Sequence, residues 1–363
     1  MILPWRSPRS AASQPRPVLK GLTDNPAYQW WREPASMQAD SWWELVDRPA
    51  ELAGQVALMR ELGVDLFRFE LPWRALAPEM PGHGRYDRAA AADPEWTGYR
   101  WGRVDAIIRA LLDGGIAPLP EVVFAPRWAQ AAGALSPAAP PARPEYFEHL
   151  MTALAVRYRG SVRLWELWNE PDHPHSWTGT LGEYVELVAR PGATAVRREA
   201  PECTLLIGGL ADARNLRSIH RAGGADLYDV ASIHHYPSRA AAGSAAAAVK
   251  QARAIEHASA HQGRPVWLTE CGIATEAPSV ASSFGGVADE AGQAALVQGL
   301  FSSSGADAVF IYQLRDTAIV AADGRLLKLV HWGLVSADLS RKKAAFDVYA
   351  AALRAPAEAA SRS

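Results

Sequence analysis

The chain of 363 residues has only two cysteines, Cys203 and Cys271. So few thiols exclude a scaffold built on disulfides and a metal centre rich in cysteine. No run of about 18 or more apolar residues occurs, and a membrane-spanning helix is therefore excluded. Neither sign of charge prevails, because 37 Lys and Arg residues stand against 39 Asp and Glu residues. The resulting net charge of −2 argues against nucleic acid or an anionic membrane as the main partner.

An export signal is also lacking. Residues 1–17 combine several Pro and Arg residues and contain no apolar segment of the length that secretion requires. We expect a disordered or surface-laid arm there, and a cytoplasmic protein. A secreted protein whose signal segment is missing from the sequence is the alternative. Tryptophan, in contrast, is abundant, and 14 Trp against 8 Phe predict flat apolar surfaces that bind a ligand.

From residue 49 onward, segments with helical periodicity alternate with short apolar segments. The predicted strands are 64–70, 116–123, 162–168, 204–208, 229–234, 265–270 and 308–312. The predicted helices are 49–62, 99–113, 145–159, 182–199, 216–222, 245–261, 289–302 and 342–353. Such alternation predicts a parallel sheet. A weakly marked first strand at 18–22 would complete eight units, which fit one (β/α)₈ TIM barrel over residues 18–355, followed by a tail at 356–363.

A doubly wound open sheet is the alternative fold. Against it, neither G-x-G-x-x-G nor G-x-x-x-x-G-K followed by Ser or Thr comes after a predicted strand. On the barrel prediction, Cys203 precedes one strand and Cys271 follows another. Strands of about 5–6 residues keep opposite barrel ends more than about 7 Å apart, so we expect two free thiols.

Two insertions stand out from the repeating units. Segment 319–330, with Asp323-Gly324 near its centre, predicts a β-hairpin after the last strand. Residues 25–43 form a long loop in this interpretation and carry the pairs Trp30-Trp31 and Trp42-Trp43. We favour packing of this loop over ligand contact as the role of these Trp pairs.

The strongest chemical signal is a carboxylate at the end of each of two predicted strands. Segment 165–171, Trp-Glu-Leu-Trp-Asn-Glu-Pro, places Glu170 just before a proline that ends the strand. Segment 265–272, Pro-Val-Trp-Leu-Thr-Glu-Cys-Gly, likewise places Glu270 at the end of a predicted strand, with a Gly two residues later that turns the chain. Active sites of TIM barrels lie at the C-terminal ends of the strands. Burying two carboxylates there is unfavourable unless they are used or paired, so we expect both to be functional.

With these two segments the chain resembles the clan A glycoside hydrolases, which are retaining (β/α)₈ enzymes. In that clan an acid/base Glu follows Asn at the end of strand 4, and the nucleophile Glu ends strand 7. The resemblance covers residues 50–350 and implies that Glu170 is the acid/base and Glu270 the nucleophile. Within the clan the chain looks most similar to family 39, the group of β-xylosidase, α-L-iduronidase and hydrolases of bacterial exopolysaccharides.

Other positions match the clan pattern. Arg68, in the segment Phe-Arg-Phe-Glu-Leu-Pro-Trp at 67–73, resembles the strand-2 Arg that hydrogen-bonds the nucleophile. His234 and Tyr236 resemble a strand-6 His-x-Tyr element, whose Tyr orients the nucleophile. The resemblance also implies that Asn169 hydrogen-bonds the sugar 2-hydroxyl.

The chain departs from the pattern at the last strand, where many members have a Trp that forms the floor of the sugar subsite. The corresponding segment 310–316 reads Phe-Ile-Tyr-Gln-Leu-Arg-Asp. Tyr312 or Gln313 is expected to line the sugar site instead, or Trp332 to reach it from the following loop. Cys271, directly after the predicted nucleophile, has no assigned role.

Several residues have two interpretations. Glu121, at a predicted strand end, either contacts sugar or is a buried structural carboxyl group, and Trp128 either stacks on a sugar ring or packs in the core. A metal site formed by His173 and His175 is disfavoured because no third ligand is evident; contact with substrate or solvent is preferred. Strand alternation places Glu166 on the face of Trp168 and Glu170, as a supporting partner of the site.

The retaining mechanism requires two carboxyl groups in different states. One attacks the anomeric carbon as a carboxylate while the other protonates the leaving oxygen. The two groups are then expected about 5–5.5 Å apart, the spacing for direct attack. An oligosaccharide or polysaccharide is the expected partner, with no cofactor and no metal. A non-catalytic sugar-binding barrel and a transglycosylase that uses the same carboxylates are the alternatives.

Overall fold

The computed structural model describes residues 17–24, 37–39, 42–82, 84–134, 136–259, 261, 263–276, 286–321 and 326–352. Almost all of the predicted N-terminal arm, the C-terminal tail, Trp30-Trp31 and Asp323-Gly324 lie outside the described residues. No described helix combines the length and the apolar character that crossing a membrane requires.

Eight parallel strands form a closed barrel. They are β1 (Leu19–Asp24), β3 (Leu66–Pro72), β4 (Ala117–Val123), β5 (Leu164–Asn169), β6 (Thr204–Gly209), β7 (Ala231–His235), β8 (Val266–Cys271) and β9 (Ala308–Tyr312). The hydrogen-bonded order is β6-β5-β4-β3-β1-β9-β8-β7, in which the first strand pairs with the last. Parallel bridges from Leu206 to Val230 and from Leu210 to Ile233 join the two ends of this order.

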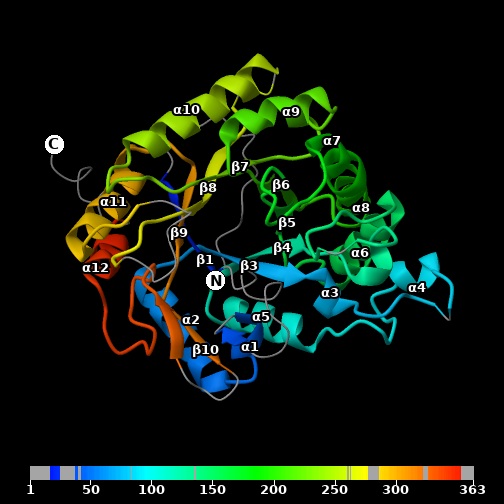
Figure 1. Cartoon of the computed structure of the whole chain (residues 1–363), viewed down its shortest axis with the longest axis horizontal. Helices are drawn as coiled ribbons and strands as arrows, with labels where there is room; N and C mark the ends of the chain where they lie inside the picture. The colour runs from blue at the N-terminus through cyan, green and yellow to red at the C-terminus, as the bar shows by residue number, and fades with distance from the viewer. Residues whose placement is uncertain are drawn as a thin grey trace.

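Helices surround the strands (Figure 1). The longer ones are α2 (Pro49–Leu62), α5 (Gly102–Asp113), α6 (Pro144–Arg157), α8 (Arg190–Glu199), α10 (Gly243–Ala258), α11 (Glu290–Ser303) and α12 (Ala344–Ala351). The shorter ones are α1 (Trp42–Leu45), α3 (Trp73–Leu76), α4 (Arg88–Ala92), α7 (Leu181–Tyr184) and α9 (Leu216–Arg221). This arrangement confirms the predicted (β/α)₈ TIM barrel, including its weakly marked first strand.

The predicted helix at 182–199 is not uniform. It consists of α7, a π-helical segment at Val185–Ala189 and α8, in direct succession. Pro191 lies at the start of α8 and has no N–H to donate to the preceding turn. The π-helical turn thus lies directly before the part of the chain that contains this proline.

The predicted hairpin is present as the antiparallel pair β10 (Thr317–Ala321) and β11 (Leu326–Val330). A third strand, β2 (Met37–Ala39), pairs with β10 and comes from the Trp-rich stretch after β1. That stretch is therefore partly strand and partly helix. Its Trp42 and Trp43 are buried in α1, and the Trp42 ring lies 4.4 Å from that of Phe67, which confirms packing as the role of this pair.

The interior of the barrel is built in layers. One apolar layer, separate from the larger cluster between strands and helices, contains Leu66, Leu119, Leu164, Leu206, Val230, Trp267, Ala308 and Phe310. Gly21 of β1 faces this layer, and a Cβ there would lie 2.3 Å from the Phe310 ring. Glycine at this position therefore leaves the space that the Phe310 ring fills. Both cysteines are buried free thiols, as predicted.

Lys20 of β1 points away from the barrel interior and is fully buried between helices. Its Nζ donates to the carbonyl oxygens of Leu62 (2.7 Å) and Tyr349 (2.6 Å), near the C-terminal ends of α2 and α12. Carbonyls at helix ends carry partial negative charge and lack partners within the helix. The Tyr349 hydroxyl also donates to the Gly21 carbonyl at 2.9 Å. These contacts fix the first strand against the last helix.

We predict that Lys20→Met lowers the free energy of unfolding by about 1–3 kcal/mol, because two buried carbonyls lose their donor. Chemical denaturation at pH 7 measures this loss. Lys342→Met is the matched control, since Lys342 is 41% exposed and pairs with Glu61 on the surface. Its loss should remain below about 1 kcal/mol. Equal losses for the two variants would contradict the role assigned to Lys20.

Alkaline pH tests the same site. Burial lowers the pKa of Lys20 from 10.5 to about 8, against the opposing charge of Asp65. Between these two values the unfolded chain binds more protons than the folded one, so this group makes stability rise with pH. The stability difference between the wild-type protein and Lys20→Met should therefore grow from pH 8 to pH 10.5.

Candidate active site

Glu170 follows the last residue of β5, where the backbone leaves the extended conformation. Trp168 has φ 80° and Glu170 has φ 39°, a region that non-glycine residues seldom occupy. The Glu170 N–H donates to the Gly209 carbonyl at 3.0 Å, which ties the turn to the end of β6. Unusual backbone conformations of this kind persist where surrounding contacts enforce them, and they concentrate at functional sites.

This turn changes which residues face the barrel interior. The Trp168 ring lies 6.3 Å from Phe147 of α6 and 5.2 Å from Trp177, and its Nε1 donates to the Ser176 carbonyl at 2.9 Å. Trp168 therefore points outward, whereas Glu166 points into the barrel. The prediction that Glu166 and Trp168 share a face was wrong, because the positive φ at Trp168 breaks the alternation of side chains.

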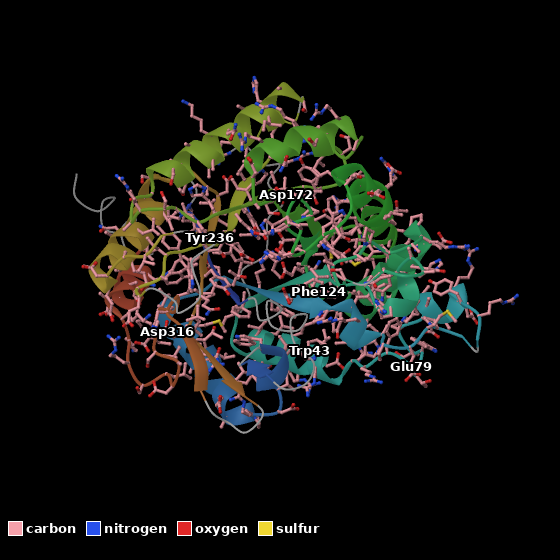
Figure 2. The ribbon with its side chains drawn as sticks, in the orientation of Figure 1. Trp43, Glu79, Phe124, Asp172, Tyr236 and Asp316 are labelled. Carbon is pink, nitrogen blue, oxygen red and sulfur yellow. The ribbon has the colours of Figure 1, made fainter. Side chains whose placement is uncertain are left out.

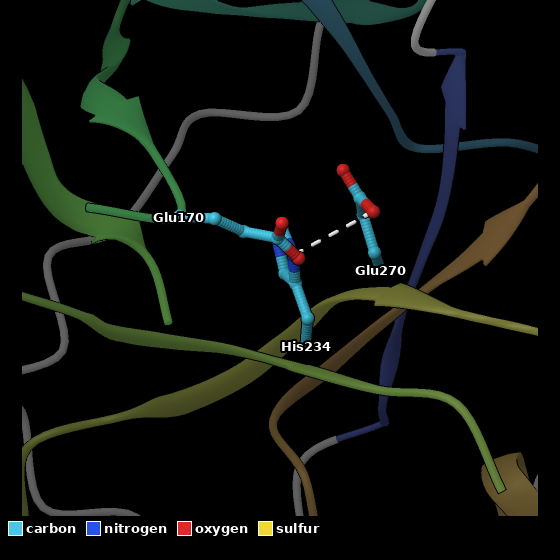
Figure 3. Close-up of side chains that lie close together, drawn as sticks. All are labelled: Glu170, His234 and Glu270. Carbon is cyan, nitrogen blue, oxygen red and sulfur yellow. Dashed lines mark hydrogen bonds and ion pairs between the residues drawn. The ribbon is translucent and has the colours of Figure 1, made fainter. Parts of the chain in front are cut away.

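Glu270 of β8 is held by groups from two other strands, β3 and β7, and from the loop that follows β7. Its Oε1 accepts from Arg68 Nη1 at 2.6 Å, and its Oε2 accepts from the Tyr236 hydroxyl at 2.6 Å. His234 Nδ1 lies 3.5 Å from Glu270 Oε2 and 2.8 Å from Glu170 Oε1. The His234 ring thus contacts both carboxylates, and the three side chains converge from separate segments (Figure 3).

The two carboxylates are close to each other. One ligand atom each from Glu170, His234 and Glu270 lies within 4.8 Å of both of the others. The side chain of Glu170 is 12% exposed and that of Glu270 is 6% exposed. Both groups are thus accessible from one side and enclosed on the others. Among the described residues, these three side chains are the set close enough to share a metal ion.

Opposing effects set the charges of this group. Burial raises the pKa of Glu270, but the charges of His234 and Arg68 and the hydrogen bond from Tyr236 together bring it below its usual value. Burial lowers the pKa of His234, but the two carboxylates outweigh it and raise that pKa. The arrangement therefore favours an ionised Glu270 beside a cationic imidazole.

His234 fits closely against β6. Its Nε2 is buried without a hydrogen-bond partner, and a Cβ on Gly209 would lie 2.0 Å from that atom. Any side chain at Gly209 would displace the imidazole ring. The glycine therefore lets His234 turn its Nδ1 toward the two carboxylates.

Arg68 lies at the centre of the barrel, fully buried. Its contacts come from four other strands, β1, β4, β5 and β8. They are Thr23 (Nη1, 3.3 Å), Glu121 (Nη2), Glu166 (Nε), Asn169 (Nη2, 2.9 Å) and Glu270 (Nη1, 2.6 Å). Glu121 has no exposed surface and touches Arg68, so it lies beneath the site and not at the surface where a sugar would bind. Its burial agrees with the structural alternative considered for it.

Three aromatic rings stand beside Glu270. The Tyr236 ring makes edge contacts with Tyr312 at 6.0 Å and with Trp332 at 5.3 Å, and the latter two rings are 5.8 Å apart. Gln313 is buried, and its Nε2 donates to Thr317 Oγ1 at 2.5 Å. The structure therefore brings Tyr312 and Trp332 to the site and directs Gln313 toward β10.

Trp128 belongs to a different group of rings. It stacks with Tyr86 at 5.9 Å, contacts Tyr146 and Trp73 by its edges, and donates from Nε1 to the Ala77 carbonyl at 2.9 Å. These contacts agree with core packing, the second of its two interpretations.

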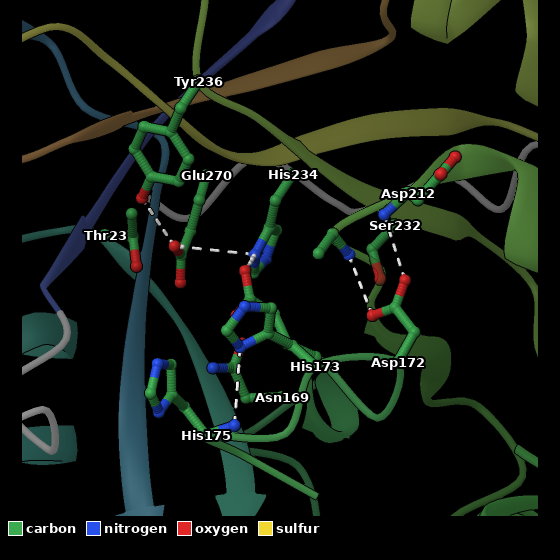
Figure 4. Close-up of polar contacts among 12 residues, drawn as sticks. Thr23, Asn169, Asp172, His173, His175, Asp212, Ser232, His234, Tyr236 and Glu270 are labelled. Carbon is green, nitrogen blue, oxygen red and sulfur yellow. Dashed lines mark hydrogen bonds and ion pairs between the residues drawn. The ribbon is translucent and has the colours of Figure 1, made fainter. Parts of the chain in front are cut away.

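The loop after Glu170 carries the remaining candidates. His173 and His175 lie 4.9 Å apart between ring centroids, and the His173 N–H donates to the Glu170 carbonyl at 2.9 Å. Both are partly exposed beside the site, and they join no set of metal-ligating groups among the described residues (Figure 4).

Asp172, which the sequence analysis did not single out, fixes this loop. Its carboxylate accepts from the N–H groups of Ala211 and Asp212, both at 3.0 Å, and from Asn215 Nδ2 at 2.9 Å.

In the view of Figure 2, Tyr236 and Asp172 lie in the central part of the molecule, whereas Glu79 lies at its edge. The position of Asp172, two residues after Glu170, was the only sequence signal that could have identified it.

Solved structures similar to this chain include glycoside hydrolases. A family 39 enzyme from Xanthomonas axonopodis pv. citri has a TM-score of 0.67 at 18% identity, and the match covers 92% of this chain and 65% of that one. A monomeric β-xylosidase from Caulobacter crescentus CB15 has a TM-score of 0.64 at 17% identity, with 92% and 67% covered. A family 39 enzyme from Bacteroides cellulosilyticus WH2 has a TM-score of 0.60 at 20% identity, with 93% and 63% covered.

The chain thus spans about two thirds of the length of these enzymes. No curated protein matches the sequence. The family model named cellulase (glycosyl hydrolase family 5) matches residues 36–306, which is most of the chain. This match confirms the predicted resemblance to clan A. The similarity to family 39 is seen in the fold of solved enzymes of that family. The chain belongs to the cellulase family, glycosyl hydrolase family 5.

Proposed function

We propose that the protein is a retaining glycosidase that cleaves a β-linked or equatorially linked glycan through a covalent glycosyl-enzyme intermediate. The observation that carries the proposal is the pair Glu170 and Glu270, with oxygens within 4.8 Å of each other. Inverting enzymes leave room for a water between their carboxyl groups, at about 6.5–9.5 Å, whereas retaining enzymes place them at about 5–5.5 Å. The short separation supports direct attack by one carboxylate.

Glu270 is the nucleophile in this proposal. Arg68 and Tyr236 each donate to one of its oxygens at 2.6 Å, which stabilises the carboxylate and directs its lone pairs. One oxygen attacks the anomeric carbon and forms an ester, while Glu170 donates its proton to the leaving oxygen. Glu170 is the more exposed of the two, which suits a group that meets first the leaving group and then water.

Hydrolysis of the ester completes the cycle. The ester removes the negative charge of Glu270, so the ionised form of Glu170 no longer faces a neighbouring anion. Glu170 then takes a proton from water, which attacks the anomeric carbon and releases Glu270. His234 Nδ1, 2.8 Å from Glu170 Oε1, stabilises the ionised form of Glu170 during this step.

The sugar is held by polar and aromatic groups. Arg68 occupies the Oδ1 of Asn169, so the amide nitrogen of Asn169 remains to donate to the sugar 2-hydroxyl. Tyr312 and Trp332 supply the apolar surface on which the ring rests, in place of a Trp at the end of the last strand. Because one similar structure is a β-xylosidase, aryl β-xylosides belong in a first screen beside other aryl glycosides and bacterial polysaccharides.

We predict different kinetic defects for the two carboxylates. Glu270→Ala should be inactive on every substrate, because no other group can form the ester. Glu170→Ala should lose activity on substrates with poor leaving groups but still form the ester from an activated aryl glycoside, which needs no proton. Azide should then restore turnover by attacking the intermediate without a general base. Each loss should be on the order of 10³-fold or more in turnover without azide.

Nuclear magnetic resonance of the azide product provides the decisive measurement. A retaining enzyme gives a glycosyl azide with the anomeric configuration of the substrate when Glu170→Ala is rescued. Near wild-type hydrolysis by Glu270→Ala would reject Glu270 as the nucleophile. A product of inverted configuration from the wild-type enzyme would reject the retaining mechanism.

We also predict that Tyr236→Phe moves the acidic limb of the kcat/KM pH profile to higher pH. The limb reports the protonation of free Glu270, and activity is lost as pH falls through its pKa. Tyr236 helps to keep that pKa below 4.5, so its removal raises it. A hydrogen bond to a charged group contributes about 1.5–3 kcal/mol, which corresponds to a shift of about one to two pH units. Tyr86→Phe, remote from the carboxylates, should leave the limb in place.

A further inference from the structure

Three glutamates stand side by side on adjacent strands beneath the site. In the register of the sheet, Glu70 of β3 pairs with Glu121 of β4, and Glu121 pairs with Glu166 of β5. All three are buried, and Glu121 and Glu166 have no exposed surface. Neighbouring carboxylates in a dry interior repel one another, so such a row requires cations or protons.

The charge of Arg74 acts on Glu70 at one end of the row. Arg68 serves the other two glutamates and, in addition, Glu270. It contacts Glu121, Glu166 and Glu270 with different nitrogens. One positive charge leaves an excess of two negative charges in this group if all three are ionised. His234 lies between Glu170 and Glu270, and with Glu170 protonated as the proposed acid a protonated His234 compensates one of them. One negative charge then still lacks a partner.

The three carboxylates differ in the donors they receive. Glu166 accepts from Arg68 Nε and from the Ser232 hydroxyl at 2.9 Å. Glu270 accepts from Arg68 and from Tyr236, both at 2.6 Å. Glu121 forms an ion pair with Arg68 Nη2, and neither of its oxygens accepts a hydrogen bond of good geometry from the described residues. Ionisation of Glu121 is therefore the least stabilised of the three.

We propose that Glu121 is a positioning residue that stays protonated in the free enzyme and, as a neutral acid, orients the Arg68 guanidinium toward Glu270. The proposal rests on the proposed function, in which Glu270 is the nucleophile. A protonated Glu121 carboxyl group fills the space beside Arg68 Nη2. It also supplies an O–H hydrogen-bond donor, whereas ionised carboxylates have only acceptors. It does so without drawing the positive charge of Arg68 away from Glu270.

The groups facing Glu121 agree with this charge state. They are Arg68 and Glu70 on β3, Glu166 on β5 and Glu270 across the barrel on β8. Burial is the largest effect and raises the pKa of Glu121 well above its usual value; the three neighbouring glutamates raise it further, and Arg68 opposes them. The proton of Glu121 is thus retained where Glu270 is ionised.

A matched pair of isosteric variants tests the charge of Glu121. Glu166→Gln removes a negative charge beside Arg68, so the acidic limb of the kcat/KM profile should move to lower pH, by about half a unit or more. Glu121→Gln removes no charge if Glu121 is already neutral, so its acidic limb should coincide with that of the wild-type enzyme. A shift with Glu121→Gln equal to that with Glu166→Gln would overturn the proposal.

Infrared spectroscopy tests the proton without any substrate. The difference spectrum between the wild-type protein and Glu121→Gln at pH 7 should contain the C=O stretching band of a protonated carboxylic acid. Bands of an ionised carboxylate in its place would overturn the proposal. Because this readout needs no activity, it separates failure of this inference from failure of the proposed function, which would appear as an enzyme inactive on every glycoside.

The positioning role requires one more comparison. Glu121→Leu removes the group beside Nη2, and kcat should fall about tenfold with little change in KM, as expected when a group acts mainly in the transition state. Glu121→Gln, which keeps the shape, should recover most of that loss. Equal kcat values for the Leu and Gln variants, at equal thermal stability, would show that Glu121 does not position Arg68. If the Leu variant does not fold, the pH profiles and the infrared band decide the matter.

Discussion

The upper half of the barrel depends on the buried guanidinium of Arg68. Arg68 belongs to β3 and contacts groups from β1, β4, β5 and β8. Five of the eight strands therefore meet at one side chain. Such convergence needs a planar cation with five fixed donors, since the point charge of Lys cannot define several directions at once. Closure of the barrel and the geometry of the candidate nucleophile therefore share the same set of contacts.

Most of the fold could be predicted from the hydrophobic periodicity of short segments of the sequence. The helix α5 places Val104, Ile107, Ile108 and Leu111 on its buried face, which is the periodicity that predicted it. The mostly apolar sequences of β4 and β8 are typical of strands covered on both faces. Glu170 and Glu270 could be identified because each interrupts such a stretch at its C-terminal end. The order of the strands then brought them together without any information on long-range contacts.

Features that depend on an unusual backbone conformation or on contacts between distant segments could not be predicted in this way. Side-chain alternation gave the wrong neighbour for Glu166 because Trp168 adopts a positive φ, which no residue type there announces. The pairing of β2 with β10 joins segments about 280 residues apart, and three-residue strands carry too little pattern to be recognised. The contacts of Glu121 with Arg68 likewise arise from the closed barrel, since strand ends in a sequence do not show which groups face across it.

The two halves of the barrel interior have opposite physical demands. The lower layer, with Leu66, Trp267 and Phe310, removes apolar surface from water and stabilises the fold without further requirements. The layer above it buries carboxylates, which weakens the fold unless each finds a cation, a donor or a proton. The site is therefore stable only as a complete network, in which the charge state of Glu270 is determined jointly by its neighbours. Strand ends exposed to solvent on one side and rigid apolar packing on the other allow that network to meet a substrate while remaining fixed in place.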